Sequence, residues 1–193
     1  AMRAVFGSTV LYPCDANQTV RLVEQMADRH GIDYLRTTRE ATPVIYGPDE
    51  VFSIGGSHVL KASDGDDIAV LAAGITVHEA LAAADRLEAV GVRTRVIDVY
   101  SVKPIDEVTI TEAARDTARL VTVEDHWPEG GLGEAVLQCL ARADVPSTVR
   151  VLAVKNMPGS GRPAELLDAA GIGAEHIVEA ALALMREKPA GTP

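Results

Sequence analysis

The sequence has few aromatic residues, few cysteines, no excess of positive charge and no long hydrophobic run, and each absence excludes a class of protein. Aromatic side chains make up 4% of its 193 residues, although 47% of the residues are hydrophobic. This aliphatic composition favours helices packed on a buried sheet over a β-sandwich, which relies more on aromatic residues. The two cysteines, Cys14 and Cys139, form no C-x-x-C pair, so we expect free thiols that are buried as small hydrophobic side chains.

The charge excess is negative, with 28 acidic residues against 18 basic residues and a net charge of −10. An excess of this sign repels nucleic acids and anionic lipid surfaces, so we expect neither as a partner. No apolar run approaches the roughly 20 residues that cross a bilayer, and the N-terminus lacks the pattern of a signal peptide. We therefore expect a soluble, cytoplasmic protein.

Apolar, β-branched runs alternate along the chain with stretches of helical period. The expected strands are Thr9–Tyr12, Asp33–Thr37, Ile54–Leu60, Ile68–Ala73, Val92–Val99, Leu120–Val123 and Val149–Val154. The expected helices are Asp15–His30, Thr76–Val90, Asp106–Ala118, Leu132–Ala143, a short helix between Pro163 and Gly171, and Ala174–Arg186. Repeated strand–helix units predict a three-layer α/β fold, in which a mainly parallel sheet has helices on both faces. The strand at 54–60 is joined to the next by a turn, so we expect it to run antiparallel at an edge.

Two helices begin with the spacing of a capping box. In this motif the side chains of the N-cap residue and of the residue three positions later each accept a hydrogen bond from the other's backbone N–H. The pairs are Asp15 with Gln18 and Thr76 with Glu79. At the other end of the chain, the segment Pro189–Pro193 is expected to be disordered.

A turn-rich stretch at Gly47–Glu50 breaks the alternating pattern and is interpreted as a linker. It separates a first segment, residues 1–46, from a larger unit, residues 51–193. Ala1 precedes Met2, as expected if Ala1 is the remnant of a tag and Met2 an engineered start. We therefore expect a fragment of a longer protein.

The glycine run Gly130–Gly133 follows a strand and opens a helix, where backbone N–H groups can hold a phosphate. No Lys-Ser or Lys-Thr pair follows it, and acidic residues such as Glu129 and Glu134 would repel an anion. We favour close packing of the helix on the strand.

The acidic run Glu124-Asp125-His126 suggests a metal site or an acid–base cluster. Adjacent residues of an extended chain point to opposite faces, so these three side chains do not easily converge on one ion. We favour a structural or interface role.

Arg36 and Arg39 flank two threonines at the expected carboxyl end of a parallel strand, the edge at which α/β sheets bind ligands. A guanidinium at this place suits bidentate contact with a phosphate. The alternative is an ion pair with a carboxylate such as Glu40 or Asp15, and spacing alone favours this second reading.

Several stretches along almost the whole chain resemble transketolases. They are Ser8–Pro13, Arg36–Arg39, Gly74–Ala80, Val123–His126, Glu129–Val136 and Gly161–Leu167. The resemblance implies that residues up to about Tyr46 are the last part of the domain that binds the pyrimidine of the cofactor. Residues from Val51 onward then resemble the transketolase C-terminal domain, whose role in the family looks structural, with a part in dimer contacts or regulation.

The resemblance implies an enzyme that depends on thiamine diphosphate and Mg²⁺ and moves two-carbon ketol units between sugar phosphates, as in the pentose phosphate pathway. Arg39 matches the family's arginine that grips the substrate phosphate. The catalytic glutamate, the metal–diphosphate motif and the sugar-binding histidines match no part of this chain, and Asp64-Gly65-Asp66 only looks like the metal motif. We therefore expect no catalytic, cofactor-binding or metal-binding residue here, and an inactive isolated chain.

The family also implies a homodimer, or pairing of this chain with the missing N-terminal half. Two other functions remain open at this point. Deoxyxylulose phosphate synthases and the β-subunits of 2-oxo acid dehydrogenases share the domain arrangement, although the stretch from Glu124 to Val136 favours transketolase. A non-catalytic assembly module is the third possibility.

Overall fold

The computed structural model describes residues 1–187, and the predicted disordered tail lies outside the described residues. The helices are a 3₁₀ turn η1 (Met2–Ala4), α1 (Ala16–Ala27), α2 (Thr76–Ala89), α3 (Glu107–Thr117), α4 (Leu132–Ala143), α5 (Pro163–Ala169) and α6 (Ala174–Arg186). The strands are β1 (Ser8–Leu11), β2 (Ile32–Leu35), β3 (His58–Lys61), β4 (Ile68–Ala72), β5 (Thr94–Asp98), β6 (Ser101–Lys103), β7 (Arg119–Val123) and β8 (Thr148–Leu152). None of the described helices is both long and apolar enough to span a bilayer.

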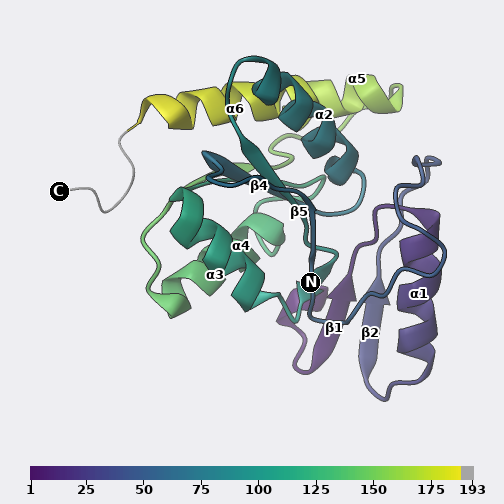
Figure 1. Cartoon of the computed structure of the whole chain (residues 1–193). Coiled ribbons are helices and arrows are strands. Elements are labelled where there is room, and N and C mark those ends of the chain that lie inside the picture. The colour runs from purple at the N-terminus through teal and green to yellow at the C-terminus, as the bar shows by residue number, and fades with distance from the viewer. Residues whose placement is uncertain (188–193) are drawn as a thin grey trace.

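The larger unit is built on a five-stranded sheet with the order β3-β5-β4-β7-β8. β4 pairs in parallel with β5 and β7, β7 pairs in parallel with β8, and β3 runs antiparallel at the edge. Helices α2 and α6 cover one face, and α3 and α4 cover the other (Figure 1). All five residues of β4 are buried, because the strand lies between both helical layers. The predicted three-layer α/β fold and the antiparallel edge strand are confirmed.

The first segment forms a β1–α1–β2 unit whose two strands are parallel. β1 also pairs antiparallel with β6, so a three-stranded sheet of order β2-β1-β6 joins the first segment to the larger unit. The sequence analysis did not predict β6, which has three residues. Leu11 and Leu22 belong to the same buried cluster as the residues of α2 and α6, so the hydrophobic core is continuous across both parts.

Neither predicted capping box forms in full: the one at Asp15 has only its N-cap half, and the one at Thr76 does not form. Asp15 is the N-cap of α1 and accepts a hydrogen bond from the Gln18 N–H at 2.8 Å, while the Gln18 side chain accepts from the N–H of Cys14 at 2.7 Å. The prediction at Thr76 is wrong, because Thr76 is the first residue of α2 and its hydroxyl contacts the carbonyls of Ala73, just after β4, and of Val123 in β7. Glu79 instead accepts from the N–H of Ala174 at the start of α6. The side chains of Thr76 and Glu79 therefore bind other parts of the fold and not each other's backbone.

The sheet has a topological switch point between β4 and β7. The helix after β4, α2, packs on one face, and the helix after β7, α4, packs on the opposite face. At such a point the loops leave the carboxyl ends of the two strands in opposite directions and open a crevice, which is where α/β proteins bind ligands.

Candidate functional site

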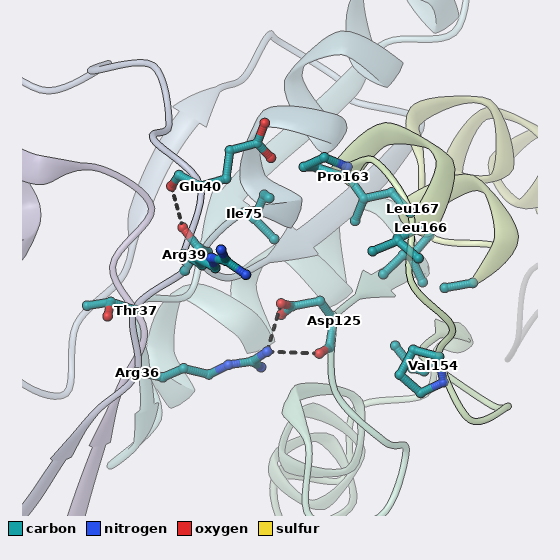
Figure 2. A pocket seen from close by; sticks show the side chains of 15 residues that line it. Arg36, Thr37, Arg39, Glu40, Ile75, Asp125, Val154, Pro163, Leu166 and Leu167 are labelled. Carbon is teal, nitrogen blue, oxygen red and sulfur yellow. Dashed lines mark hydrogen bonds and ion pairs between the residues drawn. The ribbon is translucent and has the colours of Figure 1, made fainter.

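A cavity of about 720 Å³ lies at this crevice, between the two parts of the chain. One wall is the segment Arg36–Glu40, which follows β2. The other walls come from the carboxyl ends of β4, β7 and β8 and from α5, and they include Ile75, Asp125, Val154 and Leu167 (Figure 2). The cavity thus has basic and hydroxyl groups on one side and an apolar surface facing them.

Arg36 makes an ion pair across the cavity. Its Nη2 lies 2.7 Å from Oδ2 of Asp125 and 3.0 Å from the backbone oxygen of the same residue (Figure 2). Tyr12 donates its hydroxyl to the same carboxylate oxygen at 3.0 Å, and the Arg36 guanidinium lies 4.6 Å from the centre of the tyrosine ring. Burial, followed by the negative charge of Asp125, raises the pKa of Tyr12 above its usual range, so the phenol remains a donor at neutral pH. The ion pair that spacing favoured is confirmed for Arg36, but its partner is Asp125 and neither Glu40 nor Asp15.

Arg39 is exposed, and its guanidinium points into the cavity in Figure 2. Within residues 1–187 its side chain makes neither an ion pair nor a hydrogen bond, in contrast to Arg36. The sequence analysis singled out both arginines, and the structure brings both to one cavity at the predicted carboxyl end of β2. The role of Arg39 as a phosphate ligand stays a prediction.

The far end of the segment that bears Arg39 is held by a second aspartate. Oδ2 of Asp15 accepts hydrogen bonds from the N–H groups of Ile45 and Tyr46, at 2.8 and 2.9 Å. The side chain of Asn17 donates to the carbonyl of Tyr46 at 2.8 Å. Asp15 therefore caps α1 with one oxygen and holds the end of this segment with the other.

The Tyr46 hydroxyl continues into the core, where it donates to Oδ2 of Asp98 at 2.8 Å. Gln18 and Cys14 donate to the same oxygen, whereas Oδ1 of Asp98 is buried without a hydrogen-bond partner in the described part of the chain. Burial outweighs the three donors and raises the pKa of Asp98 to about 7. Burial also raises the pKa of the Cys14 thiol. Cys14 and Cys139 are both free and buried, as expected.

The glycine run before α4 is already filled by a side chain of the protein. Oε2 of Glu124 accepts from the N–H of Leu132 at 2.6 Å, and Oε1 accepts from the N–H of Gly133 at 2.9 Å. A Cβ added at Gly131 would lie 1.9 Å from Oε2 of Glu124, and one at Gly133 would lie 2.6 Å from the side chain of Val151. The close-packing interpretation is confirmed, because Glu124 occupies the place of an anion. Burial raises the pKa of Glu124 to about 7.

The three residues of the acidic run separate, as the structural interpretation expects. Glu124 caps α4, Asp125 binds Arg36, and Nδ1 of His126 lies 2.7 Å from the carbonyl of Trp127. No group of three histidine, cysteine or acidic side chains is arranged for a metal ion among residues 1–187. Sequence reasoning missed the role of Tyr12, although it ends the first strand next to the predicted site.

The sequence matches the family model described as "Transketolase, C-terminal domain" over residues 57–177. It is 46% identical over 179 residues to transketolase-like protein 2 of Mus musculus, a match that covers 92% of the chain and 28% of the mouse protein. It is 42% identical over 184 residues to the transketolase of Homo sapiens, covering 95% of the chain and 29% of the human protein. The chain thus spans less than a third of the length of these curated relatives.

Two solved structures are also similar. One, described as a split gene transketolase in an inactive beta4 tetramer, has a TM-score of 0.88 and 37% identity, and the match covers 95% of this chain and 59% of that one. The transketolase of Campylobacter jejuni has a TM-score of 0.71 at 19% identity over 94% of this chain and 27% of that one, which shows the fold alone. From the family-model match and the relatives together, the chain belongs to the transketolase family and contains its C-terminal domain.

Proposed function

We propose that this chain is the C-terminal part of a thiamine diphosphate-dependent transketolase, which transfers two-carbon ketol units between sugar phosphates of the pentose phosphate pathway in the cytoplasm. Relatives that are 42–46% identical over more than nine-tenths of the chain, all described as transketolases or transketolase-like proteins, support it. The two unpaired cysteines are consistent with a reducing compartment.

The structural observation that best supports the proposal is the position of the Arg39 guanidinium in the cavity. Arg36, three residues earlier, is neutralised by Asp125 at 2.7 Å, whereas Arg39 faces the cavity with its donors free of partners in residues 1–187. A guanidinium offers donors in a planar fork that fits two oxygens of a phosphate. Thr37 and Thr38 line the same wall, and the Thr38 hydroxyl donates to the carbonyl of Glu40 at 2.9 Å. Arg39 would therefore hold the phosphate of a sugar substrate.

The stretch that looks like the family's metal motif, Asp64-Gly65-Asp66, does not fit a metal-bound diphosphate. The thiamine group supplies the carbanion chemistry of the reaction, and its diphosphate needs a metal ion with free oxygen ligands. Asp66, in the stretch that looks like the metal motif, accepts from Ser63 through one oxygen and from Arg95 through the other. In our proposal the cofactor site lies on the polypeptide that carries the rest of a transketolase, paired with this chain, and the complete enzyme is a dimer.

The test uses the assembled enzyme, meaning this chain together with the polypeptide that carries the rest of a transketolase. Arg39→Ala should raise the KM for ribose 5-phosphate by roughly 10- to 100-fold, as expected for the loss of hydrogen bonds to a charged group. The KM for unphosphorylated ribose should change by less than about twofold, because Arg39 would not contact this substrate. Arg86→Ala, on the exposed side of α2, is the matched control and should affect neither substrate. Equal effects of Arg39→Ala on both sugars would remove Arg39 from the substrate site.

A further inference from the structure

The small sheet β2-β1-β6 is covered by a long helix on one face only. That helix is α1, and Leu11 and Leu35 point toward it and pack in one cluster with Leu22 (Figure 1). Alternate residues of a strand point to opposite faces, so Ile32 and Tyr34 lie on the other face, where they are 49% and 40% exposed. A sheet face that water covers usually carries polar side chains. Apolar residues on both faces therefore indicate a pair of strands that is covered on both sides.

A hollow of about 290 Å³ borders this exposed face. It is lined by Val10, Tyr34 and Val102 of the small sheet, and it is bounded by η1 and by Leu132 at the start of α4. These two elements lie at the β1 and β6 side of the sheet. Within residues 1–187 no helix covers Ile32 and Tyr34, as their exposure shows.

The outer edge of β2 is also open. The N–H of Arg36 donates to the carbonyl of Leu11 at 2.9 Å, and Leu11 is paired with Leu35. Successive N–H groups of a strand point to alternate sides, so the N–H of Tyr34 also points toward β1, whereas those of Asp33 and Leu35 point away from it. In the described part of the chain β2 pairs with β1 alone, which leaves the outward groups without a strand partner.

The other sheet edges carry features that discourage the pairing of a further strand. β3 has a register shift before Lys61, β8 has the exposed Arg150 in its centre, and Pro104 follows β6 directly. β2 has neither a shift nor a proline nor a basic residue. Its charged side chain, Asp33, lies 3.9 Å from Arg29 of the adjoining turn and is itself largely covered. The edge of β2 is therefore suited to accept another strand.

We propose that β2 and the exposed face beside it are the docking surface for the polypeptide that carries the rest of a transketolase. One strand of that polypeptide extends the small sheet along β2, and one of its helices covers Ile32 and Tyr34. The inference rests on the proposed function. This chain spans 28–29% of the relatives named above, so the greater part of such a protein can supply the further strands and the second helical layer of a three-layer sheet.

A second copy of this chain fits the surface less well. Pairing of two β2 edges would satisfy their outward backbone groups. It would leave Ile32 and Tyr34 open, because α1 of each copy lies over its own strands. The exposed face therefore favours a partner with a helix to place there.

Amide hydrogen exchange of this chain, alone and in the assembled enzyme, tests the edge. The N–H groups of Asp33 and Leu35 should exchange quickly in the isolated chain and slow by roughly 100-fold or more on assembly. The N–H of Tyr34 points toward β1 and should be protected in both states. Such an alternating pattern distinguishes a new strand from a partner that merely covers the surface.

Asp33→Pro tests the same edge by substitution. It removes an outward N–H, and proline is tolerated at such a position of an edge strand, so the thermal midpoint of the isolated chain should stay nearly unchanged. Binding of the purified polypeptide that carries the rest of a transketolase should weaken by roughly 10- to 100-fold in surface plasmon resonance, because a ladder bond is lost. Asp33→Ala is the matched control: it removes the same side chain, keeps the N–H and should bind as the wild type does.

Ile32→Glu tests the exposed face. Its side chain meets solvent in the isolated chain, so the fold should tolerate the change, but a helix docked there would bury the new charge. The dissociation constant should rise by roughly 100-fold. Val108→Glu, at a valine of α3 that is also exposed, should leave it unchanged.

Two results would overturn the inference. In one, the polypeptide binds while the amides of Asp33 and Leu35 still exchange quickly and Ile32→Glu binds like the wild type. In the other, the isolated chain already protects these amides, in a dimer that Asp33→Pro dissociates. In either case ketol transfer by the assembled enzyme would leave the proposed function standing. If the polypeptide neither binds the wild-type chain nor yields ketol transfer with it, both fall.

Discussion

Lowering the pH from 7 to 5 should stabilise this fold, because Asp98 must lose its proton inside the core as the pH rises. Its carboxyl group is fully buried, and burial raises its pKa from 3.8 to about 7 in the folded protein. Below pH 3.8 the group is protonated in both the folded and the unfolded chain, and above pH 7 it is ionised in both. Between these values only the folded chain binds the proton, so the free energy of unfolding falls as the pH rises.

The size of the effect follows from the width of this window. Each pH unit inside it corresponds to about 1.4 kcal/mol per group, and Asp98 is half ionised at the upper end, which leaves about 2 kcal/mol between pH 5 and pH 7. Glu124, whose pKa burial raises from 4.5 to about 7, has the same sign and contributes about 2 kcal/mol more. The wild-type chain should therefore lose about 4 kcal/mol of stability over this range.

Urea unfolding of the wild type and of Asp98→Asn at pH 5, 6 and 7 measures this loss. Asparagine can still accept from Tyr46 and Gln18 through its oxygen, but its NH₂ group replaces the unpartnered Oδ1, at a pH-independent cost of about 1–3 kcal/mol. The readout is therefore the slope of the free energy of unfolding against pH, which should fall to about half the wild-type value. Asp49→Asn, at a side chain that is 97% exposed, should keep the wild-type slope. If Asp98→Asn also keeps it, Asp98 is ionised in the fold at pH 5 and the reasoning is wrong.

Two further predictions concern the start of α4 and the cofactor. Gly131→Ala should destabilise the chain by about 3 kcal/mol or more in urea unfolding, because the new Cβ displaces Glu124 from two N–H groups. Gly159→Ala, which has open space around its Cβ position, should change stability by less than about 0.5 kcal/mol, and a similarly small effect of Gly131→Ala would contradict the capping role of Glu124. The isolated chain should show no thiamine diphosphate binding by calorimetry in the presence of Mg²⁺, and micromolar affinity would place a cofactor site here.

The sequence predicted the elements whose periodicity is strong. The helix Leu132–Ala143 has the predicted ends, and the strand at 68–73 differs from β4 by one residue, because apolar runs and helix-start signals mark them clearly. The strand β6 was missed because three residues cannot show a period, and its partner β1 lies about 90 residues earlier. The capping box predicted at Thr76 did not form for a similar reason: the Thr76 hydroxyl binds the carbonyl of Val123, which is distant in sequence.

The site was predictable in its location but not in its contacts. The position of Arg36 and Arg39 after a parallel strand pointed to the ligand edge of the sheet, and both line the cavity. The ion-pair partner of Arg36 was sought among nearby carboxylates, whereas Asp125 is 89 residues away and only the pairing of the two units brings it close. Asp15 was unsuited to that role because its two oxygens accept backbone N–H groups.

The pairing of β1 with β6 has a consequence for how the crevice can open. Hydrogen bonds of this ladder, together with the shared cluster around Leu11 and Leu22, tie the chain before the 47–50 linker to the chain after it. Rotation about the linker would break that ladder and split the core, so we expect that the linker does not act as a hinge. Under the proposed function, a substrate would reach the exposed Arg39 through side-chain and local loop motion, on the faster timescale of such movements.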